Sequence, residues 1–419
     1  MLAWAMSPVV DIRKNPNNQN NTVTIKLPKA VPARYPASGK CPITAVSTKP
    51  NSGTLMFASI IGQANCQIFW LVVVRPNQML KIGCFMKLLI SVLLLFVFSQ
   101  AQAASVLLYH HVSSKTPKST SVSVEQFKQH LALIEELGLE VVPLTTITDA
   151  IKNNQAVSNN WVAITFDDGY RNVYDNAFPL LAEKNMPFTV FVNPKMVKPS
   201  KLYMDWEQLK TLSEAGVIIA NHTMAHENLV QDGLTTEQLI ENIEQAEAQI
   251  AERLGQNHKM LAFPYGEYNA EVEDTLAKLG YIGFAQHSGA INNTSNLTAL
   301  TRFPANGIYA NPKTLKNKIN SIAFDIKAIT PKDTKPESLH PKLVVELNSK
   351  DFYKSQLACF ISGSNKPQKP VWESDNKFVI SASNEIPKGR AKYNCTAPSI
   401  KHKGRFYWMS KLWINIDQP

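Results

Sequence analysis

The sequence predicts an α/β fold, a parallel sheet or barrel, followed by a smaller β-rich module. Short β-rich runs alternate with amphipathic helical stretches between Ser105 and Asp325, and strand-like runs without helical periodicity follow a polar segment. Repeated strand–helix units favour a parallel arrangement, because each helix returns the chain to the same edge of the sheet. At 419 residues the chain has room for one large domain and a smaller one.

The predicted strands are short runs of apolar and β-branched residues: 106–109, 162–166, 188–192, 217–220, 261–263 and 282–285. The predicted helices lie between them: 124–137, 173–184, 206–214, 236–254 and 270–279. In the 236–254 stretch, Leu239, Ile243, Ala246 and Ile250 recur at helical spacing. Ligands of such folds bind at the carboxyl ends of the strands, so polar residues there are candidates for a site.

The segment 86–103 is typical of a secretory signal peptide. Met86-Lys87 begins it, an almost entirely apolar run to Phe98 follows, and Ala101-Gln102-Ala103 forms a small-residue cleavage site before Ala104. We therefore expect Met86 to be the natural start, an exported product in the periplasm or outside the cell, and no stable membrane span after cleavage. Residues 1–85 read as an over-extended, unstructured N-terminal segment; the alternative is a genuine N-terminal region with an internal anchor.

The charge distribution argues against nucleic-acid binding. The formal net charge is +10, but residues 1–85 contribute +8 of it. Residues 104–325 hold 17 Lys/Arg and 24 Asp/Glu, whereas residues 326–419 hold 16 and 8, so an acidic main domain precedes a basic tail. A solvated basic surface is the simplest interpretation of that tail.

The C-terminal part divides into a predicted linker, 326–340, and a β-rich module, 341–419. Cys359 and Cys395 are the two cysteines after the signal segment, and in an exported chain they most simply form one disulfide. Six aromatic residues accompany the basic residues: Trp372, Tyr393, Phe406, Tyr407, Trp408 and Trp413. An aromatic and basic face of this kind could hold a glycan or an anionic envelope polymer.

The motifs that carry chemistry follow predicted strands. Asp167 and Asp168 come directly after one strand, and His222 and His226 lie four positions apart after another. Carboxylate oxygen and neutral imidazole are ligands for Zn²⁺ and similar metals. Helical i,i+4 spacing would let both imidazoles face one ion, with Asp168 as the third ligand and an open position for water.

The other carboxylate and a nearby turn complete the predicted chemistry. Asp167 is then left to accept the proton of the attacking water. Pro264-Tyr265-Gly266, just after a further strand, forms a tight turn that could present the Tyr265 amide to a developing oxyanion. The combination predicts metal-assisted hydrolysis.

These motifs resemble those of the polysaccharide deacetylases, metal-dependent carbohydrate esterases with a NodB-homology domain. Thr165-Phe166-Asp167-Asp168-Gly169-Tyr170, His222-Thr223-Met224-Ala225-His226 and Pro264-Tyr265-Gly266 look like the first three family motifs. The resemblance covers residues 104–325. It implies a distorted (β/α) barrel that removes N-acetyl groups from an amino-sugar polymer, with Zn²⁺ as the first choice of metal and Co²⁺ or Ni²⁺ as alternatives.

The sequence departs from the family pattern at two places. The arginine that usually precedes the Pro-Tyr motif is absent, and Arg302 is the candidate to support Asp167 instead. The usual Leu-x-His is also absent, whereas Leu107-Leu108-Tyr109-His110 opens the domain and resembles the branch that acts on exported poly-N-acetylglucosamine. We expect His110 as the general acid, with His287 second and His111 third. Asp205 and Trp206 resemble groove residues that bind substrate, and Pro264, His287 and Arg302 are further candidates for substrate contacts.

We therefore expect an exported metal-dependent polysaccharide N-deacetylase whose partner is an acetylated amino-sugar polysaccharide. Two alternatives stay open. One is an O-acetyl polysaccharide esterase, because the same chemistry cleaves esters. The other is a catalytically weakened envelope glycan-binding protein, which the missing arginine would favour.

Overall fold

The structure is a computed structural model that describes residues 12–13, 24–25, 56–60, 69–73 and 103–416. Contacts divide the chain into two units, Met1–Phe98 and Ser99–Pro419. In the first unit β1 (Ile12–Arg13) pairs with β2 (Thr24–Ile25), and β3 (Met56–Ile60) pairs with β4 (Phe69–Val73). These strands contain β-branched and aromatic residues, which favour extended backbone. Most of residues 1–85 lie outside the described residues, so the unstructured N-terminal segment stays a prediction. The predicted signal peptide lies outside the described residues except for Ala103.

The second unit is built on a parallel sheet. Its strands are β5 (Ser105–Tyr109), β8 (Glu140–Val141), β9 (Trp161–Phe166), β10 (Phe188–Val192), β11 (Ile218–Asn221), β12 (Met260–Ala262), β13 (Ile282–Phe284) and β14 (Phe303–Pro304). The main path runs β13-β12-β11-β10-β9-β5-β14, and β8 pairs with β9 beside it. Each predicted strand of this sheet is present, displaced by no more than one residue at an end. The α/β prediction is confirmed.

The segment 300–305 joins the two ends of this sheet. Its first half bonds to β13, where the Leu300 N–H donates to the carbonyl of Gly283 at 2.8 Å. Its second half bonds to β5, where Phe303 is in register with Leu107 and the Ala305 N–H donates to the carbonyl of Leu108 at 3.0 Å. The sheet is thereby closed into a barrel, in agreement with the distorted (β/α) barrel that the sequence predicts.

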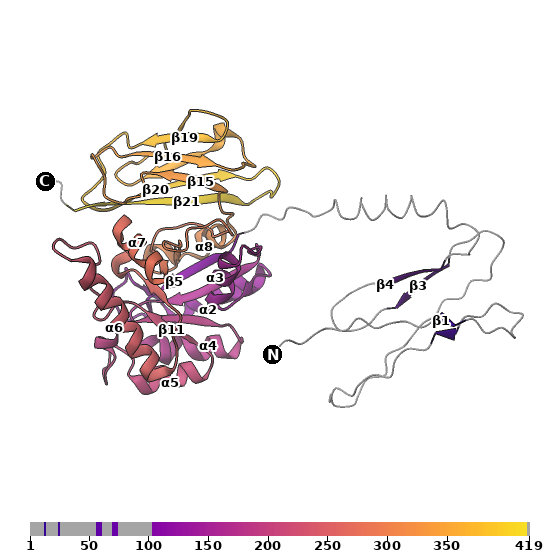
Figure 1. Ribbon diagram of the computed structural model, residues 1–419, viewed down its shortest axis with the longest axis horizontal. Coiled ribbons are helices and arrows are strands. Elements are labelled where there is room, and N and C mark those ends of the chain that lie inside the picture. Colours follow the sequence, from indigo (N-terminus) through magenta and orange to yellow (C-terminus); the bar gives the residue numbers. More distant parts are fainter. Residues whose placement is uncertain (1–11, 14–23, 26–55, 61–68, 74–102, 417–419) are drawn as a thin grey trace, which may run out of the picture. The chain divides into compact units, whose positions relative to one another are not determined.

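Helices cover the outside of the barrel (Figure 1). They are α2 (Val124–Glu136), α3 (Leu144–Lys152), α4 (Phe178–Glu183), α5 (Trp206–Glu214), α6 (Thr236–Leu254), α7 (Ala270–Leu279) and α8 (Pro312–Ile319), and a π-helical turn, η2 (Val173–Ala177), precedes α4. Ser123, Asp205 and Thr235 begin α2, α5 and α6 with reciprocal capping boxes, which satisfy amides that the first helical turn leaves free. In the part of the chain that the structure describes, no helix has the length and apolarity needed to cross a bilayer.

Alternating side chains of the strands fill two cores, because successive residues of a strand point to opposite faces. Leu107, Ile164 and Val190 pack in one cluster with residues of α2 and α5. Val106 and Ala163, their neighbours in sequence, pack in a second cluster with residues of α3. The strands are therefore buried on both faces, which explains why they read as nearly continuous apolar runs.

The C-terminal module is a sandwich of two antiparallel sheets. One sheet has the order β15 (Ile326–Thr330), β16 (Lys342–Leu347), β19 (Lys377–Ser381), β18 (Val371–Trp372), and the other β17 (Ala358–Ile361), β20 (Gly389–Pro398), β21 (Phe406–Asn415). Cys359 and Cys395 are register partners on β17 and β20 and form the predicted disulfide. The predicted linker is wrong for residues 326–330, because β15 pairs with β16 and so belongs to the sandwich.

The sandwich packs on the barrel through β21, as Figure 1 shows in yellow beside α7 and α8. The backbone N–H of Trp408 donates to the carbonyl of Ile322 at 2.9 Å, and the Trp408 ring packs edge-on against Phe303 of β14 at a centroid distance of 5.5 Å. Tyr393 and Trp413 are buried in the sandwich core. The predicted aromatic face is therefore wrong for Tyr393 and Trp413, whose rings stabilise the module, whereas the partly buried Trp408 ring contacts the barrel.

Candidate functional site

The structure brings three predicted metal ligands together at the carboxyl ends of β9 and β11. Asp168 follows β9, His222 follows β11, and His226 lies in the loop beyond it. Asp168 Oδ1 is 3.1 Å from His222 Nε2 and 3.4 Å from His226 Nε2. Ligand atoms of all three residues lie within 4.8 Å of one another, which fits a single ion.

The hydrogen bonds of His222 show which atoms are available to a metal. His222 Nδ1 donates to the carbonyl of Ala262 at 2.7 Å, so the neutral ring directs the lone pair of Nε2 toward Asp168. Both His222 Nε2 and Asp168 Oδ1 are buried and have no hydrogen-bond partner. Two lone pairs that face each other at 3.1 Å need a cation between them. The residues therefore fit a divalent metal.

The charges in the cluster reinforce one another. Burial raises the pKa of Asp168, but the hydrogen bond that a protonated His222 would donate and the charge of that ring outweigh burial and hold the pKa of Asp168 below its usual value. Burial lowers the pKa of His222, but Asp168 and Asp167 reverse the effect, so the pKa of His222 is raised. A proton therefore competes with a metal for the site, and the competition grows as the pH falls.

The site is held by strained backbone. Asp168, Thr223, His226 and Tyr265 have φ values of 71°, 68°, 63° and 60°, in the left-handed region that residues with a Cβ rarely adopt. The helical spacing predicted for His222 and His226 is wrong, because the positive φ at Thr223 and His226 makes this segment a loop. The Thr223 N–H donates to the Asn221 side chain at 2.8 Å, which stabilises the turn that brings both imidazoles to Asp168.

Asp167 lies beside the metal-ligand cluster and is paired with Arg302. Arg302 Nη1 and Nη2 donate to the two carboxylate oxygens of Asp167 at 2.7 and 2.8 Å, and both side chains are fully buried. Arg302 Nε also donates to the carbonyl of Ala285 at 2.9 Å. Burial raises the pKa of Asp167, but the charge of Arg302 and then that of His222 outweigh it, so the carboxyl group stays ionised. Arg302 thus supports Asp167, as predicted, and its buried guanidinium is not placed to contact substrate.

His110 lines the same cleft as Asp168 and His226, which has a volume of about 610 Å³. The Asn306 Nδ2 donates to His110 Nδ1 at 3.1 Å and to the carbonyl of Thr120 at 3.2 Å. Because Nδ1 accepts this bond, the ring proton of neutral His110 resides on Nε2. Burial lowers the pKa of His110, which keeps the ring neutral.

The Pro264–Gly266 turn forms another wall of the cleft. Tyr265 lines the cleft, and its ring meets that of His226 edge-on at 4.4 Å. Gly266 has a φ of 71°, and a Cβ there would lie 2.5 Å from the Cβ of Gln286. Only glycine therefore lets the turn pack this closely, and Pro264 beneath it is buried.

Four other predicted residues lie outside the cluster. Asp205 Oδ1 accepts the Gln208 N–H at 2.9 Å as the cap of α5, and Trp206 packs partly buried against the core. His111 is buried and stacks on Tyr170 at 3.6 Å. None of the three lines the cleft that holds His110.

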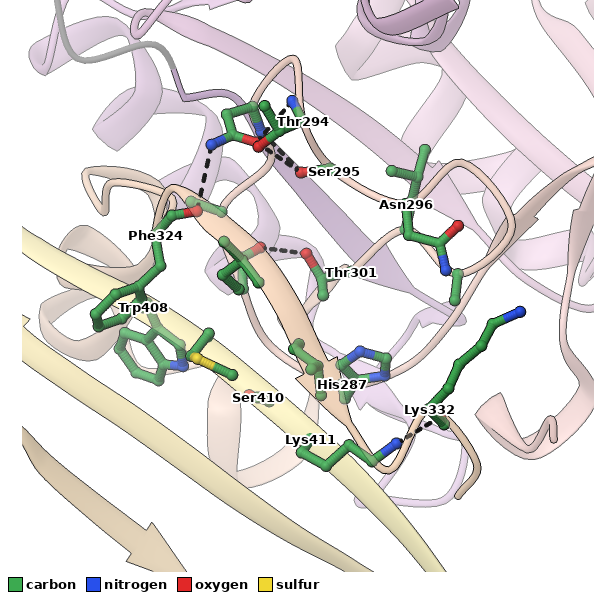
Figure 2. A pocket seen from close by; sticks show the side chains of 18 of the residues that line it. His287, Thr294, Ser295, Asn296, Thr301, Phe324, Lys332, Trp408, Ser410 and Lys411 are labelled. Atoms are coloured by element: carbon green, nitrogen blue, oxygen red, sulfur yellow. Dashed lines mark hydrogen bonds between the residues drawn. The ribbon is translucent and has the colours of Figure 1, made fainter. Parts of the chain in front are cut away.

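The fourth, His287, lies in a separate cavity between the barrel and the sandwich. Figure 2 shows it there with Lys411 and Trp408 of β21. His287 is buried, and burial followed by the charges of Lys392 and Lys411 lowers its pKa to about 3. The structure thus favours His110 over His287 as the acid, because only His110 lines the cleft with the metal ligands.

Among the cleft residues that sequence reasoning missed are Asn306, Ser362, Arg390 and Lys392. Asn306 follows β14, so its place after a strand was a usable signal. Arg390 and Lys392 lie on β20, in the module, more than 160 residues beyond His226 in the sequence. Their alternation with Ala391 indicates one polar strand face, but nothing in the sequence shows that this face meets the barrel.

Residues 154–284 match the model of the family "Polysaccharide deacetylase". This part of the chain is therefore similar to the polysaccharide deacetylases. This deacetylase domain is similar to YxkH of Bacillus subtilis (strain 168), which carries the family's name provisionally, at 28% identity over 47% of this chain and 69% of that protein. It is also similar to the poly-beta-1,6-N-acetyl-D-glucosamine N-deacetylase of Staphylococcus aureus (strain MRSA252), at 24% identity over 45% of this chain and 69% of that protein.

Two solved structures are also similar to part of this chain. IcaB from Ammonifex degensii is 23% identical, with a TM-score of 0.48, over 53% of this chain and 99% of that one. The Streptococcus pyogenes deacetylase PplD in complex with acetate is 22% identical, also with a TM-score of 0.48, over 52% of this chain and 99% of that one.

Proposed function

We propose that this polysaccharide deacetylase is an exported, metal-dependent enzyme that hydrolyses the N-acetyl groups of amino-sugar polymers. The observation that carries the proposal is the pair of buried, unpartnered atoms, Asp168 Oδ1 and His222 Nε2, that face each other at 3.1 Å beside an ionised Asp167. The signal-peptide pattern in residues 86–103 supports export. The name of the Staphylococcus aureus relative supports poly-N-acetylglucosamine as the first polymer to test.

Each residue of the cleft has a defined part in this reaction. A divalent metal held by Asp168, His222 and His226 would supply Lewis-acid chemistry, polarising the acetamide carbonyl and lowering the pKa of a water molecule. Asp167, held ionised by Arg302, accepts the proton of the attacking water.

The other cleft residues act on the leaving group and on the developing charge. His110, once protonated, donates its Nε2 proton to the departing amine and returns to the neutral ring, whose Nδ1 accepts the hydrogen bond from Asn306. The Tyr265 amide, in the strained turn, is the proposed donor to the developing oxyanion. Acetate and a free amino sugar result.

The contact between Arg302 and Asp167 also bears on the alternative of an inactive glycan-binding protein. That alternative drew its support from a missing arginine. Here a buried arginine makes two hydrogen bonds to the catalytic carboxylate from another part of the chain. The reason for expecting lost turnover is therefore gone.

Acetate release from N-acetylglucosamine oligomers tests the proposal, with the protein treated with chelator and then given Zn²⁺ or Co²⁺. We expect release to stop and then return. Asp168→Asn should lose both metal and activity, because it removes a ligand. Asp167→Asn should keep the metal and lose activity, and full turnover by that variant would overturn the base assignment. Metal binding without acetate release would direct attention to acetyl xylan and other esters.

A further inference from the structure

The cleft has a second charged wall, which the C-terminal sandwich supplies. Arg390 and Lys392 of β20 line the same cleft as Asp168. Side chains alternate along a strand, so residues 390 and 392 point to one side, whereas Ala391 between them is buried in the sandwich core. The sandwich therefore forms part of the site and places two cations there.

Lys392 has no compensating carboxylate. Its Nζ donates to the carbonyl of Gln286 at 3.0 Å, and within residues 103–416 it forms no ion pair. Arg390 differs, because its Nε is 3.6 Å from Glu267 Oε1 and its Nη1 donates to the carbonyl of Tyr265. An ammonium group has three donor hydrogens, so Lys392 keeps two for a ligand.

The surroundings of Lys392 make an unpaired charge unfavourable. The side chain is half-buried, and burial followed by the charge of Arg390 lowers the pKa of Lys392 to about 8, so most of it stays charged at neutral pH. The one acidic side chain that lines the cleft is Asp168, which belongs to the metal-ligand cluster. A desolvated cation with no carboxylate partner in the described residues indicates an anion that arrives with the ligand.

We propose that this cationic wall selects amino-sugar polymers whose neighbouring sugar units carry carboxylates. The inference rests on the proposed deacetylase function and names the substrate class of that site. The carboxylate accepts hydrogen bonds from Lys392 Nζ and from the hydroxyl of Ser362, which also lines the cleft. Ser362 Oγ accepts a hydrogen bond from the backbone N–H of Lys392 at 2.9 Å, which leaves the hydroxyl proton of Ser362 free to donate to a ligand.

The test compares two matched substrates. Oligomers of alternating N-acetylglucosamine and glucuronic acid present a carboxylate beside each acetamide, and the same oligomers after reduction of the carboxyl groups to alcohols are neutral. The quantity measured is the ratio of kcat/KM for acetate release from the acidic and the neutral oligomer. We expect a ratio of about ten in the wild-type protein, the magnitude of one charge-assisted hydrogen bond.

Two substitutions then test whether Lys392 causes the preference for the acidic oligomer. Lys392→Gln should reduce the ratio about tenfold, because it removes the charge that pairs with the carboxylate. Lys403→Gln removes the same charge from an exposed turn of the module and should leave the ratio unchanged. Because the ratio is taken within each variant, a partial loss of folded protein cancels. Added salt should lower the wild-type ratio, since screening weakens the attraction.

Two outcomes would overturn the proposal: equal kcat/KM for the two oligomers in the wild-type protein, or a ratio in Lys392→Gln that equals that of Lys403→Gln. Failure of the deacetylase function itself looks different, because then neither oligomer releases acetate with metal present.

Discussion

Replacing Arg302 with methionine tests the central contact of the site. The change keeps a long apolar side chain inside the barrel and removes the guanidinium that makes two hydrogen bonds to Asp167. Both side chains are fully buried, so Asp167 would be left as a buried charge without its partner. Breaking a buried pair in this way costs about 3–5 kcal/mol of the free energy of unfolding. At about 2–4 °C per kcal/mol, the melting temperature should fall by roughly 6–20 °C.

The pH dependence of this loss follows from the pKa of Asp167. In the wild-type protein that pKa is lowered, so the stabilisation by ionised Asp167 is fully present above the unfolded value of about 3.9 and is lost as the pH falls through the folded value. Arg302 makes the largest contribution that lowers this pKa, so in the variant we expect burial to raise the pKa of Asp167 above the unfolded value. The variant then loses stability as the pH rises, so the gap in melting temperature between wild type and variant should shrink from pH 7.5 to pH 5.

The assay is thermal unfolding of the wild-type protein and three variants at both pH values, together with acetate release. Arg302→Met combined with Asp167→Asn should melt above Arg302→Met alone, because the unpaired carboxylate is gone. Arg253→Met is the matched control, since Arg253 is exposed and packs over Trp206 at 5.9 Å, and it should change stability by less than about 0.5 kcal/mol. A melting temperature of Arg302→Met equal to that of the wild-type protein at pH 7.5 would refute the reasoning.

Two further predictions concern the turn and the metal. Gly266→Ala should lower both the melting temperature and the rate of acetate release, because the new Cβ would lie 2.5 Å from Gln286. Gly255→Ala is the control: Gly255 has a similar φ of 68°, but a Cβ there would meet no atom within 4 Å. This control measures the cost of the backbone conformation alone, and it should keep activity. Comparable losses in both variants would show that the close approach has no effect. Zn²⁺ affinity, measured by calorimetry, should fall from pH 8 to pH 6 because the raised pKa of His222 lets protons compete near neutrality. Affinity that is constant over this range would contradict the assignment of His222 as a ligand.

Most strands and helices of the barrel, and the three candidate metal ligands, could be predicted from the sequence because each has a local signal. A buried parallel strand produces an apolar run, and the capping residues of α5 and α6 mark where helices begin, so these elements were placed within one or two residues. Asp168, His222 and His226 were found because each lies close behind a strand in a recognisable motif.

The elements that the sequence did not reveal lack such local signals. The strand β14 has two residues, one of them Pro304, and so gives no strand pattern. The helix α3 has the sequence LTTITDAIK, in which β-branched residues favour extended backbone as much as helix, and tertiary packing of Ile147 and Ile151 decides the outcome.

The contribution of the sandwich to the site depends on contacts between distant residues. The β-strand pattern of the module was visible, but no periodicity indicates which face meets the barrel. Arg302 and Asp167 are 135 residues apart, and Arg390 and Tyr265 are 125 apart. Contacts of this kind follow from the closed fold, so the cationic wall could be seen only in the structure.

The position of Arg302 links closure of the barrel, docking of the sandwich and catalysis. Arg302 lies between Leu300, which bonds to β13, and Phe303, which pairs with β5 and packs against Trp408 of the sandwich. A shift of this segment would therefore move the guanidinium away from Asp167. In the proposed mechanism the sandwich thus acts on the site in two ways: it supports the segment whose Arg302 keeps Asp167 ionised, and it supplies the cation that we propose to face the substrate.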